Sequence, residues 1–353
     1  MSRIVAGGCE SYDEALLEEF FSRAFEEIAA PPAGCKVLLK PNLLVGKSPN
    51  KAVNTHPAFV RTVALMLLRG GCRVFVGDSP GYESTERALE KSGIMEVVRS
   101  LRLEIAPFRK RVTKVNNGIS PYRELVFGED PLDYDLVINM PKLKTHMMMG
   151  ITAGVKNTFG FVPYLDKAKW HLRCKRDRLL FASVLMDIHA AVKPALTILD
   201  GVTGMDGNGP ANGRVRHLGI VAVSDDALSL DAFLESRLPV PSPLPVSILA
   251  GEKGLLHETS VIDLGMPPVE DFLMPESMEV DWNLPSLLGE TARRVFTVRP
   301  KWVRKRCNMC RTCVNVCPGG AIRTGETNIL FDYRLCIRCY CCHEMCPTGA
   351  ITV

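Results

Sequence analysis

The stretch LVINMPKLKTHMMMG, residues 136–150, joins two different kinds of sequence. Its apolar start, residues 136–138, has the length and composition of a buried strand. The residues that follow include Lys142, Lys144 and His146, and Lys156 comes soon after, with methionines and glycines between them instead of acids. Cations this close together repel one another. The stretch therefore indicates a strand whose end binds another chemical group.

The same change from an apolar run to a polar end recurs along the first part of the chain. Strand-like runs lie at residues 37–39, 74–76, 136–138, 196–199 and 220–223. Helices are predicted after a capping box of Ser11 and Glu14, and at residues 57–69, 84–91, 178–192 and 226–237. Strands that alternate with helices predict an α/β fold with a largely parallel sheet and flanking helices. We expect this domain to occupy residues 1–298.

The polar side chains at the strand ends predict a pocket, because ligands of open α/β sheets bind beyond the carboxyl ends of the strands. Closely spaced lysines need an anion or a buried acid between them. We therefore expect an anionic small molecule, bearing a carboxylate or phosphate, to bind at Lys40, Asn42, Asp78, Lys142, Lys144, Thr145, His146, Lys156, Asn157, Asp200 and Asp206. Lys144 and His146 are the predicted catalytic residues, His146 as a proton donor because an ordinary histidine pKa lies near working pH.

Less specific explanations stay open for several features. Methionines 147–149 can fill a core, and His56 and His171 are more typical of surface or capping positions than of ligand sites. For the basic stretches 167–178 and 293–311, a solvated surface is expected in preference to an anion-binding surface. No phosphate loop or dinucleotide fingerprint is complete, so a bound NAD or FAD is not expected.

The end of the chain contains a repeat, CNMCRTCVNVCPGGAI at 307–322 and CIRCYCCHEMCPTGAI at 336–351. Each copy reads C-x-x-C-x-x-C-x-x-x-C-P, a spacing that wraps three thiolates around one iron–sulfur cluster and gives the fourth to another. Two 4Fe–4S clusters are predicted, one held by Cys307, Cys310, Cys313 and Cys346 and the other by Cys336, Cys339, Cys342 and Cys317. Cys341 is not needed as a ligand, and a pair of zinc sites is the less favoured alternative.

The repeat closely resembles a bacterial two-cluster ferredoxin, with both Cys-Pro ends present. We expect residues 299–353 to form a small α+β domain of this kind, which depends on its clusters because it has little apolar core. The resemblance implies one-electron transfer with an electron donor or acceptor protein.

A second resemblance covers roughly residues 35–240 and is carried by KPNLL, THP, GDSPG, PKLKTH, GVKNTFG, LDGVTGMDGNGP and SDDALSLD. Together these motifs are similar to the family named domain of unknown function 362, several members of which also carry ferredoxin clusters. The resemblance implies the α/β core and a role for the lysine stretch, and it implies no substrate.

Composition places further limits on function. Hydrophobic residues make up 46% of the chain, charged residues 23%, and the net charge of +4 is too small to favour nucleic acid. Without a long apolar run, neither a membrane span nor a signal peptide is predicted. Nine of the 13 cysteines follow residue 306, which favours metal ligation in the cytoplasm over disulfides.

The leading hypothesis is a ferredoxin-coupled reductase that acts on the anionic molecule. The first alternative is an electron carrier or adaptor whose α/β domain docks a redox partner. Delivery of clusters or metal is the weaker alternative.

Overall fold

The computed structural model describes residues 1–353 except 29, 242 and 279–297. A 10-stranded sheet is built from β1 (Ser2–Gly8), β2 (Lys36–Pro41), β3 (Arg73–Val76), β4 (Glu104–Ile105), β7 (Leu136–Met140), β8 (Lys142–His146), β9 (Gly150–Thr152), β10 (Leu196–Asp206), β11 (Arg214–Ser224) and β12 (Thr259–Leu264). Its order is β12-β1-β11-β10-β7-β2-β3-β4, with β8 beside β10 and β9 beside β8. The pairs from β10 through β7, β2 and β3 to β4 are parallel, which confirms the predicted α/β class.

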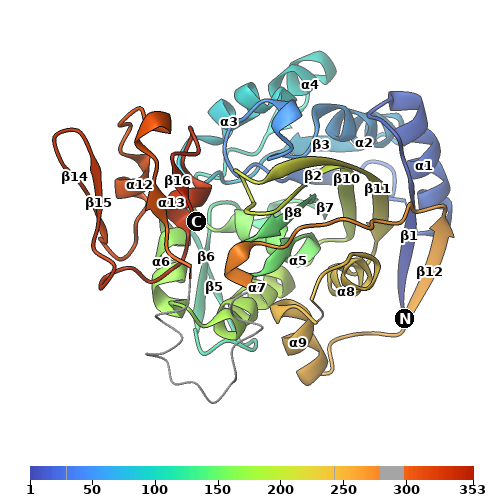
Figure 1. Ribbon diagram of the computed structural model, residues 1–353. Coiled ribbons are helices and arrows are strands. Elements are labelled where there is room, and N and C mark those ends of the chain that lie inside the picture. Colours follow the sequence, from blue (N-terminus) through green and yellow to red (C-terminus); the bar gives the residue numbers. More distant parts are fainter. Residues whose placement is uncertain (29, 242, 279–297) are drawn as a thin grey trace.

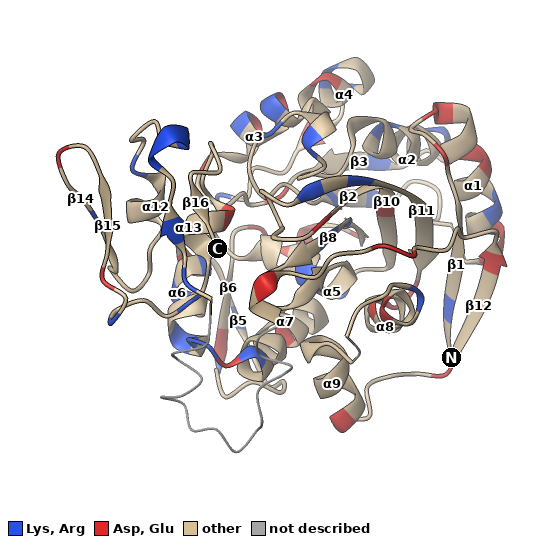
Figure 2. Ribbon diagram, in the orientation of Figure 1, with Lys and Arg blue, Asp and Glu red and all other residues tan. Residues whose placement is uncertain are grey.

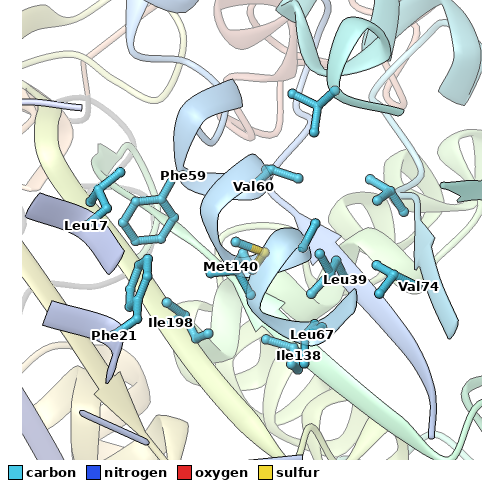
Figure 3. Close-up of a cluster of buried hydrophobic side chains, with 14 of the residues drawn as sticks. Leu17, Phe21, Leu39, Phe59, Val60, Leu67, Val74, Ile138, Met140 and Ile198 are labelled. Atoms are coloured by element: carbon cyan, nitrogen blue, oxygen red, sulfur yellow. The ribbon is translucent and has the colours of Figure 1, made fainter. Parts of the chain in front are cut away.

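Helices cover both faces of this sheet (Figure 1). One group comprises α1 (Glu14–Glu27), α2 (Pro57–Arg69), α3 (Thr85–Ser92) and α4 (Ile94–Leu101), and the other α5 (Gly154–Asn157), α6 (Tyr164–Cys174), α7 (Arg178–Val192), α8 (Ala227–Arg237) and α9 (Pro245–Glu252). Successive side chains of a strand point to opposite faces. Leu39 of β2 accordingly packs in a cluster with Phe59 of α2, as Figure 3 shows, while its neighbour Leu38 belongs to the cluster that contains Leu185 of α7.

Helix positions follow the sequence signals closely, with one difference in a cap. Helices α2 and α7 have the predicted bounds, and His56 caps α2 by accepting a hydrogen bond at Nδ1 from Ala58 N at 3.2 Å. The predicted capping box of α1 is wrong, since Asp13 accepts hydrogen bonds from Ala15 N and Leu16 N. Ser11 instead accepts one from the backbone of Asp13, because the carboxylate lies nearer the first free N–H groups.

The lysine stretch is itself a strand, which the sequence pattern did not predict. Strand β8 runs parallel to β10 and antiparallel to β9, and all of its residues are buried. Because side chains alternate along a strand, Lys142, Lys144 and His146 share one face. Strand β8 thus places these three polar groups side by side at the edge of the sheet.

The C-terminal region is small and contains short antiparallel strands, as predicted for a ferredoxin-type domain. Its pairs are β13 (Lys301–Trp302) with β16 (Ile351–Thr352) and β14 (Ile322–Thr324) with β15 (Ile329–Phe331), and its helices are α12 (Thr312–Asn315) and α13 (Cys341–Glu344). A separate hairpin of β5 (Val112–Val115) and β6 (Glu124–Phe127) lies beside α6 (Figure 1). The predicted boundary at residue 298 follows residues 279–297, which lie outside the described residues, so it stays a prediction.

The C-terminal region packs directly on the α/β region. Cys339, Tyr340 and Cys341 belong to the same buried apolar cluster as Phe159 and Phe161. A Cβ atom added at Gly81 would lie 2.3 Å from the sulfur of Met345, so the Met345 side chain packs closely on this glycine. Polar contacts add to the joint, since Asn212 Nδ2 donates to the carbonyl oxygen of His343 at 2.7 Å. The cysteine-rich region therefore forms one wall of any site at this edge of the sheet.

Candidate functional site

Two of the predicted cations at the strand ends are neutralised by buried acids. Lys40 Nζ lies 2.9 Å from Asp78 Oδ1, and Lys142 Nζ lies 2.9 Å from Asp200 Oδ2. All four side chains are almost fully buried. Each pair brings together residues of separate strands or strand ends, and each removes the need for an external anion at that lysine.

The acid opposite Lys142 is held by a larger network. Tyr12 donates its hydroxyl proton to Asp200 at 2.8 Å, His56 donates its backbone N–H at 2.8 Å, and Lys142 donates to the Tyr12 oxygen at 2.6 Å. The Tyr12 ring also stacks on His56 with centroids 3.6 Å apart. With its carboxylate held by three donors, Asp200 has a structural role in this arrangement.

Lys144 lies between the pairs, and none of the described acids forms an ion pair with it. Its Nζ donates to Asn42 Oδ1 at 2.8 Å and to the carbonyl oxygen of Val53 at 2.6 Å. Burial lowers its pKa well below the usual value, and the neighbouring Lys142 and Lys156 lower it further. Lys144 therefore positions Asn42, whose amide in turn donates to Asn157 Oδ1 at 2.9 Å.

A cavity of about 350 Å³ lies where the sheet edge meets the cysteine-rich region. From the α/β side its lining includes Asn42, Asp78, Lys156, Asn157, Lys167 and His171, and from the C-terminal side Thr312, Asn315, Val316, Cys341, Glu344 and Met345. A second cavity of about 40 Å³ shares five of its lining residues with the first and is also lined by Lys142, Lys144 and His146. A pocket of the larger size suits a small molecule, and the smaller one is large enough for ordered water.

Lys156 faces the larger cavity, and no acid among the described residues forms an ion pair with it. Its Nζ lies 4.5 Å from the centre of the Phe159 ring and 5.8 Å from that of Phe181. Its ammonium donates no hydrogen bond to the described residues and forms no ion pair with them. Burial lowers its pKa to about 8, although Glu344 and Cys341 act in the opposite direction.

Two residues of α6 extend this cationic side of the cavity. Lys167 donates to the carbonyl oxygen of Ser79, and burial, with Lys40 and Lys156 nearby, lowers its pKa to about 7. His171 is 4% exposed, and its Nδ1 has no hydrogen-bond partner among the described residues. Burial and Lys156 lower its pKa to about 3, so His171 is neutral.

His146 does not have the near-neutral pKa on which its predicted role as a proton donor was based. Burial lowers that pKa well below its usual value, and Lys156 and other cations lower it further. Its Nδ1 accepts the backbone N–H groups of Met148 and Met149 at 3.1 and 3.2 Å, so the ring proton is on Nε2. This atom lies 3.4 Å from Oε1 of Glu344, a residue of α13. Helix α13 therefore contributes a side chain to the smaller cavity.

Among the described residues no three Cys, His, Asp or Glu side chains lie close enough together to hold a metal ion, so the two predicted cysteine groups stay a prediction. Burial, with Cys346, Cys310 and Cys307 nearby, raises the pKa of Cys313 to about 11. Likewise burial, with Cys339, Cys336, Cys317 and Cys313 nearby, raises that of Cys342 well above its usual value. Thiols that disfavour one another's ionisation in this way suit a cationic centre, and the fourth ligand that each cluster takes from the other run stays a prediction.

Two further features of these loops fit bound clusters. Met309 and Arg311 of the first copy have φ values of 57° and 63°, and the equivalent Arg338 and Tyr340 of the second have 57° and 58°. Non-glycine residues rarely adopt such values, so the loops share a specific shape. Arg338 is 3% exposed, yet among the described residues its guanidinium nitrogens have no hydrogen-bond partner. A thiolate-ligated cluster carries negative charge and would compensate this buried cation.

Comparison with known proteins identifies both parts of the chain. Residues 37–234 match the family described as domain of unknown function (DUF362), and residues 300–323 and 329–352 each match the 4Fe-4S binding domain. The chain belongs to the DUF362 family. A curated relative, thylakoid-associated protein sll1697 from Synechocystis sp., is 33% identical over 271 residues, which cover 74% of this chain and 84% of that protein.

This DUF362 chain is also an iron–sulfur protein of the electron-transfer type, with motifs for two 4Fe–4S clusters. The lactate racemase apoprotein from Thermoanaerobacterium thermosaccharolyticum matches at 12% identity and a TM-score of 0.38, over 57% of this chain and 51% of that one, a likeness too small to carry an argument. In the described part of the chain, no helix is both long and apolar enough to cross a membrane. The cytoplasmic location stays a prediction.

The DUF362 motifs do not all meet at the cavity. Thr145 donates to the carbonyl oxygen of Gly207 at 2.8 Å, and Asp200 serves Lys142. Asp206 pairs with Arg214 at 2.7 Å and Arg216 at 3.0 Å, and it too is absent from the lining of both cavities. Of the predicted ligand residues, the structure brings Asn42, Asp78, Lys156 and Asn157 to the larger cavity.

Sequence reasoning missed Lys167, His171 and Glu344. Lys167 and His171 lie in the basic stretch that was expected to be solvated. With Trp170 and Cys174 they have the spacing of residues on one face of a helix. A lysine and a histidine on an otherwise apolar helix face are a sequence signal from which their inward position could have been predicted. Glu344 lies between two cluster cysteines, and no pattern in the sequence showed that it faces His146.

Proposed function

We propose that this protein is a ferredoxin-coupled reductase whose substrate is a small molecule with an anionic head group, bound in the larger cavity. The observation that carries the proposal is the Lys156 ammonium, which faces the cavity without an anionic partner among the described residues. A cation in such surroundings favours an anion beside it, because the anion replaces the lost solvation. The cavity also borders the region that carries the cluster motifs, so substrate and electron source would be neighbours.

The lining supports a ligand with one charged end and an apolar body. Asp78 and Glu344 offset part of the positive charge, so the cavity suits one anionic group better than a polyphosphate. Leu43, Phe159 and Val316 provide apolar contacts on the remaining walls. A carboxylate with an aromatic or alkyl body fits both features better than inorganic phosphate.

The side chains divide the work of binding and proton supply. Bound clusters supply electrons one at a time. Lys156 holds the anionic head group, and Lys167 is the proposed proton donor because its pKa, lowered by burial to about 7, lies near working pH. Lys144 and His146, proposed as catalytic from the sequence, act here as positioning residues through Asn42 and Glu344.

Removing the Lys156 charge should abolish ligand-dependent stabilisation. We expect benzoate to raise the unfolding temperature of the parent protein more than acetate or phosphate does. Lys156→Met should weaken benzoate binding about ten- to a hundredfold, since a charge-assisted hydrogen bond is worth roughly 1.5–3 kcal/mol. Lys193→Met, at an exposed lysine after α7, is the matched control and should bind normally. Equal stabilisation of both variants would contradict the assigned head-group site.

Anion affinity should fall as pH rises from about 6 to 9. The pKa values of Lys167 and Lys156 are about 7 and 8, so each loses the proton that attracts the anion within this range. The groups around Lys156 are Glu344 and Cys341 of α13, Lys40 of β2 and Asp78 after β3. Titration calorimetry with benzoate checks the slope, and pH-independent affinity would contradict a cationic site.

The empty protein should show the opposite pH dependence. Because burial lowers the folded pKa of Lys156 below its unfolded value, the unfolded chain binds more protons between about pH 8 and 10.5. Stability without ligand should therefore rise through this window, and the rise should be smaller in Lys156→Met.

The reductase activity itself is tested under anaerobic conditions. Carboxylates that stabilise the protein are added to the chemically reduced chain, and the visible absorbance of the clusters is followed. Reoxidation that depends on the added molecule supports a reductase. Stabilisation without reoxidation would overturn it and favour a carrier or adaptor in which the cavity only binds.

A further inference from the structure

The two halves of the cysteine repeat are similar in sequence but differ in exposure. In the second copy Arg338, Cys339, Tyr340, Cys341 and Cys342 are all buried, and Cys339, Tyr340 and Cys341 pack against the α/β region. In the first copy Cys310 is exposed and Cys307 is partly exposed. The centre formed by Cys307, Cys310, Cys313 and Cys346 therefore has the open side, and a protein that exchanges electrons with this chain approaches there most closely.

This open side carries a group of unpaired cations. Arg304, Lys305 and Arg306 form the short 3-10 helix η4 (Arg304–Arg306) immediately before Cys307, and Arg311 follows Cys310. All four are exposed, and within the described part of the chain none has an acidic partner in an ion pair. Figure 2 shows Lys and Arg together at the turn beside α12. We call these four residues the basic rim.

Within the described part of the chain, local acids do not neutralise the basic rim. Residues 301–353 contain eight Lys or Arg and three Asp or Glu, and one of those acids, Glu344, is buried at the cavity. Elsewhere on the surface, exposed cations commonly have partners, as Arg99 has in Glu90 and Arg69 in Glu18. Like charges held together without acids destabilise the free protein slightly, so their arrangement favours a function in association.

We propose that the basic rim is the docking surface for an acidic one-electron carrier protein. Its position around the exposed Cys310 favours a redox partner over a nucleic acid, because charge complementarity there brings the partner's redox centre to the open cluster site. Cys307, Cys310, Cys313 and Cys346 would hold the cluster that accepts one electron from the docked carrier, with no bond made or broken. The proposal depends on the cluster region alone and not on the substrate cavity.

Charge reversal on the rim tests the docking surface. The full-length protein with its clusters is titrated with an oxidised acidic two-cluster ferredoxin, and binding is measured by calorimetry without turnover. Arg304→Glu/Lys305→Glu should weaken binding on the order of tenfold or more at about 20 mM salt, and the difference should shrink at about 500 mM. These two side chains make no hydrogen bond with the described residues, so the fold should tolerate the change.

The matched control reverses two cations elsewhere. Lys193→Glu/Lys253→Glu changes the net charge equally, at the exposed ends of α7 and α9, and should change affinity less than twofold. As a second measurement, the acidic ferredoxin in its reduced form should reduce the rim variant more slowly than the control, while a photoreduced neutral deazaflavin reduces both alike.

Two results would overturn the proposal. The first is equal weakening by the rim and control pairs, which would make the effect one of net charge. The second is unchanged ferredoxin binding together with rim-dependent binding of duplex DNA, which would identify a nucleic-acid surface.

Discussion

Cys342→Ser should lower the iron content of anaerobically purified protein from about eight atoms per chain to about four, whereas Cys341→Ser should leave it near eight. The two cysteines are adjacent and both buried, yet they face different surroundings. Cys342 lies near Cys339, Cys336, Cys317 and Cys313, while Cys341 lines the larger cavity. Iron and labile sulfide analysis of the two variants, with spectroscopy of the reduced protein, measures the difference.

Cys341→Ser serves as the control for general damage. Both substitutions exchange a buried sulfur for oxygen in the same short helix, so a packing defect alone should affect them similarly. If iron is lost from both variants, the helix rather than the ligand set decides cluster retention. If it is lost only from Cys341→Ser, the ligand assignment of the second run is wrong by one position.

The parts of the fold that the sequence predicted are those with a local signal. Residues 178–192 have helical periodicity, and α7 has those bounds, because an apolar stripe must be buried whatever the strand order is. The two cysteine runs are equally local, since their spacing is set by the ligand geometry of a cluster. Strand β8 was missed because its lysines are charged, and charge normally indicates exposure.

The candidate site was predictable only in part, because its walls come from distant segments. The sequence indicated that Lys142 and Lys156 lie near one another, but not that Asp200 neutralises the first and leaves the second free. That difference depends on which strands are neighbours, and strand order has no local signal. The cavity is formed by segments that are still farther apart in the sequence. Lys167 on α6 and Glu344 on α13 come together only when the cysteine-rich region packs on the sheet edge.

Lys142→Ala should lower the free energy of unfolding by about 3–5 kcal/mol, in contrast with Lys156→Met, which should leave it unchanged or raise it. Removing the Lys142 ammonium leaves the Asp200 carboxylate with no exposed surface and no counter-charge, and Tyr12 loses a hydrogen-bond donor. Lys156 has no such partner among the described residues, so its removal leaves no unpaired acid of that kind behind. Denaturant unfolding of both variants at pH 7, without added anions, measures the two effects.

The double variant Lys142→Ala/Asp200→Asn distinguishes a broken ion pair from lost packing. If the cost of Lys142→Ala comes from the unpaired carboxylate, removing that charge as well should recover much of the stability, because the backbone N–H of His56 can still donate to the amide oxygen while the amide NH2 donates to the Tyr12 hydroxyl. If the double variant is as unstable as the single one, packing dominates. A stable Lys142→Ala that loses anion binding would show instead that Lys142 serves the ligand. The lysine stretch would then be a single binding site, rather than one structural cation beside one that is free to bind.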